Sequence, residues 1–280
     1  MTTHTPSIEI RELTKQYGNT VAAEVIEPPV PSLSAEARRP VGHVLDQHRS
    51  IRTASLIAGV GLLVMSALAG FGYRVAIAGL VTQGDAARTA KDIMGSESLF
   101  RFGILSLFLV VALDVVVARA LRHVFITVDK RISALAAWFR IAYAAVFAIA
   151  ISRLVGVLGL LNKHSDRAGF STTHLHNLAL QRINTFTDIW DAGLVLFGLH
   201  LLVIAYLAYR SGYVPKLLAV LVAIAGLGYL FDSFGAALSR GASPDVSSVT
   251  FIGEFLLALW LVIWGRRITV SASGSHGRTI

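Results

Sequence analysis

Residues 99–118 read LFRFGILSLFLVVALDVVVA, a run of 20 residues in which only Arg101 and Asp114 carry a charge. A helix needs about 20 mostly apolar residues to cross the hydrocarbon core of a bilayer. Runs of the same kind lie at 54–73, 132–154, 189–209, 217–238 and 249–264. The sequence therefore predicts an all-α fold, a polytopic membrane helix bundle with six transmembrane helices.

The composition supports a membrane environment and excludes several kinds of chemistry. The chain is 54% hydrophobic and 15% charged, whereas soluble domains carry about 25% charged residues. Its net charge of +8 is spread between the apolar runs and forms no basic face, so we expect no nucleic-acid partner. There is no cysteine, which excludes thiolate metal sites and a thiol nucleophile. We expect no cofactor, and the lipid bilayer is the expected partner.

The distribution of lysine and arginine predicts the orientation. The connection between the second and third runs holds Arg119, Arg122, Lys130 and Arg131, and the N-terminal flank and C-terminal tail are also basic. Basic connections stay in the cytosol, which places both termini there. We expect a multi-pass protein of the plasma membrane, the inner membrane of a bacterium. Its expected parts are a largely disordered cytosolic segment 1–53, a six-helix membrane domain 54–267 and a disordered tail 268–280.

Two connections on the opposite side are long enough to hold structure. Asp85 follows Gly84 and is a suitable N-cap for a short helix up to Met94. The stretch 175–186 is partly amphipathic, which predicts a segment on the membrane surface.

Ionisable residues within the runs are the candidate functional residues, because each costs about 2.5–3.5 kcal/mol to insert. The rise along each helix predicts that six of them share the outer part of the membrane and form one polar or ion-binding cluster. Asp114 and Arg140 lie deeper and form a predicted pair between the second and third helices. His200 lies near mid-depth, either as a packing residue or as a proton relay. The six residues of the predicted outer cluster are Arg101, Arg153, Asp188, Asp191, Asp232 and Glu254.

Two interpretations of these charges stay open. Four acids exceed two arginines, so one or two acids would face water or take up a proton or cation. Alternatively, the charged pairs only fix the register of the helices. A loop with His164, Asp166, His174 and His176 fits ordinary loop polarity better than a metal site, so no metal is predicted.

Three functions fit these observations. The leading one is a non-enzymatic membrane protein that transports or senses a small solute or ion, whose identity the sequence does not reveal. The second is a structural or regulatory subunit that packs with another membrane protein or with a second copy of itself. The third is a membrane-embedded enzyme that uses the outer acids as general acid or base. No nucleophile or metal set accompanies those acids, and no catalytic residue is assigned.

The polar positions also occur in short ordered motifs. The chain contains GDAA at 84–87, LFRFG at 99–103, DIWDAG at 188–193, FGLH at 197–200, YRSGYVP at 209–215 and GYLFDSF at 228–234. In these motifs, residues 54–267 resemble a bacterial integral-membrane family known as domain of unknown function 4386. The resemblance implies an integral membrane protein and supplies no activity.

A second, shorter resemblance concerns the N-terminal segment. Residues 8–22, IEIRELTKQYGNTVA, are similar to the opening strand of a transporter ATP-binding subunit, in which a tyrosine equivalent to Tyr17 stacks on adenine. The Gly-rich phosphate loop that follows in that family is missing here. Without a phosphate cradle, ATP hydrolysis is not expected. A gene-fusion relic or a start site placed too far upstream would account for the segment.

Overall fold

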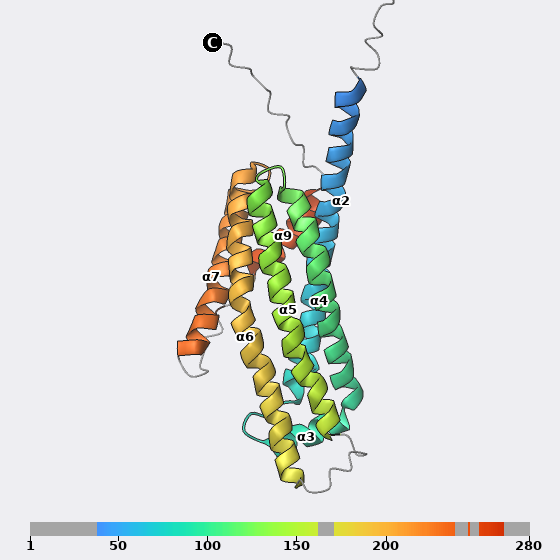
Figure 1. The fold of residues 1–280 in the computed structure, drawn as a ribbon, viewed down its shortest axis with the longest axis vertical. Helices are drawn as coiled ribbons and strands as arrows, with labels where there is room; N and C mark the ends of the chain where they lie inside the picture. Colours follow the sequence, from blue (N-terminus) through green and yellow to red (C-terminus); the bar gives the residue numbers. More distant parts are fainter. Residues whose placement is uncertain (1–37, 162–170, 239–245, 247–251, 266–280) are drawn as a thin grey trace, which may run out of the picture. The chain divides into compact units, whose positions relative to one another are not determined.

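The protein is described from a computed structural model, which places residues 38–161, 171–238, 246 and 252–265. These residues form helices and turns and contain no strand. The chain divides after Val44, and the bundle belongs to the unit Leu45–Ile280. In chain order (Figure 1), the elements are α2 (Arg38–Ala69), the π-helical turn η1 (Gly70–Val75), the 3₁₀ turn η2 (Ala78–Leu80), α3 (Ala86–Gly95), α4 (Glu97–Phe125), α5 (Lys130–Leu161), α6 (Thr172–Ser211), α7 (Lys216–Leu238) and α9 (Ile252–Ile263).

Five helical segments are long and apolar enough to cross a membrane. They are Ser50–Leu80, Glu97–Phe125, Lys130–Leu161, Thr172–Ser211 and Lys216–Gly235. The sixth apolar run forms α9, which is apolar but only 12 residues long. The predicted polytopic helix bundle is therefore confirmed, with five long apolar helices and one shorter apolar helix among the described residues.

Two helices extend beyond their predicted limits. The first begins at Arg38 rather than at residue 54, so part of the segment expected to be disordered is helical. The predicted surface segment 175–186 is wrong, because it continues into the fourth apolar run as the 40-residue helix α6. Ile183 and Phe186 are buried in the bundle, and the Ser171 side chain caps the helix by accepting a hydrogen bond from the N–H of His174.

The predicted short helix after Asp85 is confirmed. Asp85 caps α3, because its Oδ1 accepts a hydrogen bond of 2.9 Å from the N–H of Arg88. Ile93 is buried and belongs to the common hydrophobic core. α3 packs against α6, and this explains why α6 can extend so far as an ordered helix.

Small residues bring the helices close together. A Cβ on Gly198 of α6 would lie 2.8 Å from the carbonyl oxygen of Gly226 on α7, and the converse distance is 2.9 Å. A Cβ on Gly103 of α4 would lie 2.5 Å from the Cβ of Ala76, just after η1. Membrane helices gain little from the hydrophobic effect between themselves, so this close backbone approach supplies much of their packing.

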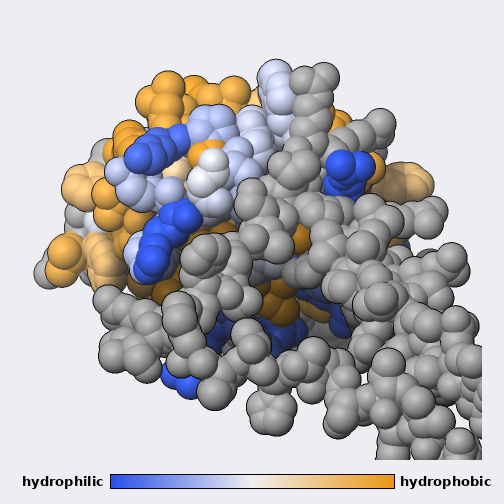
Figure 2. Space-filling view, turned by 90° about the horizontal axis from the view of Figure 1, so that it is seen from above, coloured by the Kyte–Doolittle hydropathy of each residue, from blue (hydrophilic) through white to orange (hydrophobic). Residues whose placement is uncertain are grey.

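The outward-facing side chains of the long helices are apolar. Leu105, Leu217 and Leu227 are among the exposed large hydrophobic residues. Trp138 and Tyr209 are also exposed and lie near the ends of α5 and α6, as expected of aromatic residues at a membrane boundary. Seen along the bundle (Figure 2), hydrophilic residues lie on the end face and hydrophobic residues around its edge. This surface is that of a protein surrounded by lipid.

Candidate functional site

A buried arginine on α5 occupies the centre of the bundle. Arg140 is 1% exposed, and its Nε donates a hydrogen bond of 2.8 Å to Oδ1 of Asp114 on α4, which is fully buried. The two residues predicted to bridge the second and third helices therefore contact each other. Burial of a lone charge is costly, so each residue stabilises the buried state of the other.

His200 on α6 completes a chain of hydrogen bonds with this pair. Its Nε2 lies 3.2 Å from Nη1 of Arg140, and its Nδ1 lies 2.8 Å from the carbonyl oxygen of Ala136. A guanidinium only donates and a carbonyl only accepts, so Nε2 accepts and Nδ1 carries the hydrogen. In this arrangement His200 is neutral and both ring nitrogens are occupied. The geometry favours an orienting role over a proton relay.

Two apolar side chains surround the rest of the guanidinium. Nη2 of Arg140 lies 3.8 Å from the sulfur of Met65 on α2. Cζ lies 5.4 Å from the ring centroid of Phe197 on α6, a cation–π contact. Arg140 therefore joins α5 to α2, α4 and α6. Neither Met65 nor Phe197 was predicted as a site residue, because neither carries a charge, although Phe197 belongs to the FGLH motif.

The second carboxylate oxygen of Asp114, Oδ2, is buried and has no hydrogen-bond donor among the described residues. Glu254 on α9 forms no ion pair among the described residues, but it lies within reach of the charges of Arg140 and Asp114. The central cluster, defined as Asp114, Arg140, His200 and Glu254, therefore contains two carboxylates and one guanidinium.

The position of Glu254 corrects a prediction. The sequence placed this residue in the outer part of the membrane, at the start of a full span. Gly253 instead packs on the backbone of Leu221, about 8 Å along α7 from Lys216. At its other end, α9 passes Gly59 of α2, where a Cβ would lie 2.8 Å from the carbonyl oxygen of Ala258. Glu254 therefore lies in the same half of the bundle as the central cluster and apart from the outer acids, because α9 is short and packs near the Lys216 end of α7.

An aromatic layer adjoins the cluster on its outer side. The indole N–H of Trp190 donates a hydrogen bond of 3.0 Å to the hydroxyl of Tyr143. The Tyr143 ring lies 4.9 Å from that of Phe197, and the Tyr229 ring lies 5.1 Å from Phe197 at a steep angle. Tyr229 also interacts electrostatically with Glu254. These rings link Phe197, which contacts Arg140, to Trp190, the neighbour of Asp191.

Three of the predicted outer acids lie near one another. Asp191 on α6 interacts electrostatically with Asp188 on the same helix and with Asp232 on α7. Asp188 is exposed, Asp191 is partly buried and Asp232 is buried. Oδ1 of Asp232 accepts a hydrogen bond of 3.0 Å from the N–H of Val246. Among the described residues, no ion pair joins Asp188 or Asp191 to a basic side chain.

The two predicted outer arginines lie apart from these acids. Arg101 pairs with Glu97 at 2.6 Å, one turn earlier on α4, and its side chain is 59% exposed. Arg153 is exposed on α5, and none of the described ion pairs includes it. Both residues are about 35 Å along their helices from the basic end, near the outer limit of a 30 Å hydrocarbon core. Water or headgroups can solvate them there, which removes the need for a buried partner.

The described residues include no group of three histidine or acidic side chains that could hold a metal ion. His164 and Asp166, from the predicted polar loop, lie outside the described residues. His174 and His176 lie in the first turns of α6.

Comparisons with known proteins identify a family and assign no activity. Residues 57–265 match the family described as "Domain of unknown function (DUF4386)". An "Uncharacterized protein" from Archaeoglobus fulgidus is 36% identical over 168 residues, which cover 60% of this chain and 86% of that protein. No solved structure matches.

The N-terminal resemblance to a transporter ATP-binding subunit is not supported by these comparisons. Residues 8–22 lie outside both the family match and the described residues. The membrane domain, by contrast, contains every motif that pointed to the other family. The match over residues 57–265 covers most of the chain, and the chain, a multi-pass helical bundle, belongs to the DUF4386 family.

Proposed function

We propose that this protein transports or senses a small solute or ion by binding a proton or a small cation at the central cluster. The observation that supports the proposal is that Asp114 pairs with Arg140 at 2.8 Å, while Glu254 lies within reach of the same guanidinium and forms no ion pair among the described residues. His200 is neutral in its hydrogen-bonded arrangement and adds no charge. With both carboxylates ionised the cluster has an excess negative charge, which a proton or cation would offset.

The outer acids extend the proposal toward the membrane surface. Asp188, Asp191 and Asp232 form a group of like charges that would raise the local concentration of cations. The Trp190–Tyr143 hydrogen bond joins the neighbour of Asp191 to a residue one turn from Arg140, so we propose that it lies on the path of the ion. We place the protein in the plasma membrane with both termini in the cytosol, and the asymmetry of lysine and arginine supports this orientation.

The test compares carboxylate variants of the purified full-length chain. Proteoliposomes containing a pH-sensitive dye report proton uptake under an imposed potential, and ²²Na⁺ and ⁸⁶Rb⁺ dialysis reports cation binding. Glu254→Gln should abolish the response that the parent shows, because it removes the excess charge. Asp188→Asn, at the exposed end of the acid group, should retain most of it. Melting temperatures measured in parallel separate loss of binding from loss of folding.

Two outcomes would overturn the proposal. One is a parent protein that neither takes up protons nor binds either cation. The other is a folded Glu254→Gln variant that responds like the parent.

A structural or regulatory subunit is the second candidate. The favouring observation is that Arg140 contacts three other helices and uses all of its nitrogens. A residue held in this way can have a purely structural role, in which it fixes the positions of the helices. This candidate predicts that the protein's abundance in cells depends on a partner membrane protein, and that every variant of the central cluster lowers the melting temperature without any ion response in the parent.

A further inference from the structure

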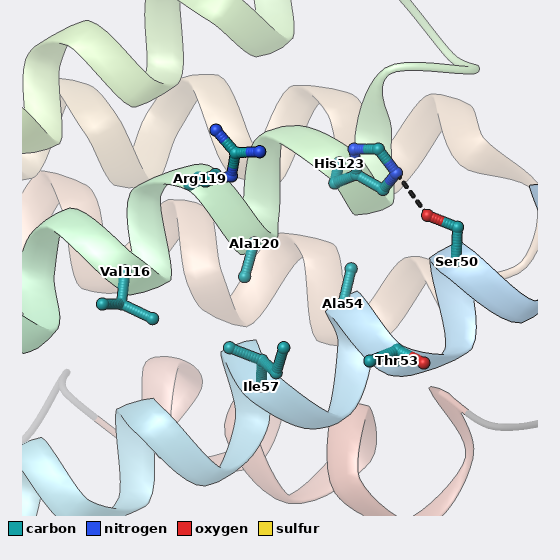
Figure 3. Close-up of a pocket in the computed structure, with 8 residues that line it drawn as sticks. All are labelled: Ser50, Thr53, Ala54, Ile57, Val116, Arg119, Ala120 and His123. Carbon is teal, nitrogen blue, oxygen red and sulfur yellow. Dashed lines mark hydrogen bonds between the residues drawn. The ribbon is translucent and has the colours of Figure 1, made fainter.

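A pocket opens between α2 and α4, apart from the central cluster (Figure 3). Its volume is about 640 Å³, within the usual range for small-molecule sites. Ala54 and Ala120 form part of its lining and are buried, so the hollow exists because both helices present only a methyl group there. The pocket is large enough for part of a lipid molecule.

One end of the pocket is polar and basic. Ser50 begins the first membrane segment, and its hydroxyl lies 2.6 Å from Nε2 of His123, close to the end of α4. Thr53 and Arg119 also line the pocket, and Arg119 is exposed. None of the described residues that line the pocket is acidic. Ser50 and His123 form the end itself, and Thr53 and Arg119 lie about one turn further in (Figure 3). Together they present a guanidinium, an imidazole and two hydroxyls, a set that suits a phosphate group.

The other end of the pocket is apolar and lies deeper in the membrane. Ile57 and Val116 line it and are 45% and 47% exposed. Ile57 is seven residues beyond Ser50, and Val116 is seven residues before His123, which places both about 10 Å deeper. The change from polar to apolar therefore follows the membrane normal, in the direction in which a phospholipid passes from headgroup to acyl chain.

We propose that this pocket binds an anionic phospholipid, with the phosphate beside Arg119 and His123 and an acyl chain along Ile57 and Val116. Charge complementarity selects the lipid, since the described lining residues include an arginine and a histidine and none of them is acidic, which favours a headgroup with net negative charge. The open sides of Ile57 and Val116 let the chain enter from the bilayer. Binding would tie the inner ends of α2 and α4 together.

The test titrates the detergent-solubilised full-length protein with dioctanoyl phosphatidylglycerol and follows binding by native mass spectrometry. Arg119→Gln should weaken binding about fivefold, the effect of one arginine at a membrane surface. Arg122→Gln is the matched control, because Arg122 is exposed on the same helix but does not line the pocket. It should leave the affinity within twofold of the parent. Dioctanoyl phosphatidylcholine should bind at least fivefold more weakly.

A second variant tests the apolar end. Val116→Trp fills the deeper part from an exposed position, so it should fold and should weaken binding of the lipid but not of inorganic phosphate. Equal weakening by Arg122→Gln would indicate diffuse surface charge and overturn the proposal. Equal affinity for the two lipids would also overturn it. Binding of inorganic phosphate that depends on Arg119, together with lipid binding unaffected by Val116→Trp, would indicate a site for the anion alone.

Discussion

Replacement of Arg140 by methionine should destabilise the bundle more than any other single loss of charge. The change removes the 2.8 Å hydrogen bond to Asp114 and the 3.2 Å hydrogen bond to His200. Hydrogen bonds to charged groups contribute about 1.5–3 kcal/mol each. It also leaves the Asp114 carboxylate buried without a donor, and removing one partner of a buried pair costs roughly 3–5 kcal/mol.

Membrane proteins in general would suggest a smaller free-energy cost, because polar contacts between their helices average about 0.6 kcal/mol. That average includes pairs whose partners find replacement donors. Asp114 is fully buried, and its Oδ2 already has no donor among the described residues. We therefore expect the larger cost.

Thermal unfolding of the detergent-solubilised protein gives the measurement. A domain of this size loses about 2–4 °C in Tm for each kcal/mol, so Arg140→Met should lower the melting temperature by roughly 6–20 °C. Arg101→Met makes the same chemical change at an exposed pair with Glu97. Such pairs contribute about 0.3–0.5 kcal/mol, so this control should lower Tm by about 2 °C or less.

A double-mutant cycle tests the physical reasoning directly. Once Arg140 is methionine, the additional change Asp114→Leu removes the stranded charge and should recover part of the lost stability. Pairs in direct contact couple by about 0.5–3 kcal/mol. The reasoning is refuted if Arg140→Met melts within 2 °C of Arg101→Met, or if the two changes are simply additive.

Further predictions concern packing, capping, the aromatic layer and topology. Gly198→Ala should lower Tm by several degrees, because its Cβ would meet the carbonyl oxygen of Gly226, whereas Gly70→Ala meets nothing within 4 Å and should be neutral or stabilising. Asp85→Ala removes the cap of α3 and should cost about 0.5–2 kcal/mol, with faster proteolysis near that helix as the readout. Tyr143→Phe strands the Trp190 N–H and should cost about 1–3 kcal/mol, with a shifted Trp emission. Reporter fusions at the two ends should give the same cytosolic signal, and signals from opposite sides would contradict the proposed topology.

The bundle and the Asp114–Arg140 pair could be predicted from the sequence because each avoids a large free-energy cost, the exposure of apolar runs to water in one case and the burial of a lone charge in the other. Long apolar runs have few alternatives to spanning a bilayer. A charge deep in such a run requires a partner of opposite sign at the same depth, and Asp114 and Arg140 were close in depth by simple counting.

The outer cluster was only partly predictable. Apolar length indicates that a run lies in the membrane but not where it begins, so the packing of Gly253 on Leu221 and the resulting depth of Glu254 had no signal in the sequence. Arg101 did have a signal. Glu97 lies four residues before it, a spacing at which opposite charges pair on one helix.

The amphipathic stretch 175–186 shows a different difficulty. An apolar stripe next to a membrane run fits both a surface segment and a longer helix that packs against a neighbour. α3 supplies that neighbour. Hydrophobic periodicity cannot distinguish lipid from protein as the covering surface.

The length of α6 has a mechanical consequence. Its 40 residues extend about 60 Å, twice the thickness of a hydrocarbon core. One continuous helix therefore connects the α3 side of the protein to His200. If α6 tilted by roughly 10° around a point about 30 Å from one end, that end would move by about 5 Å. A change in the contact with α3 would therefore displace His200, which holds Arg140.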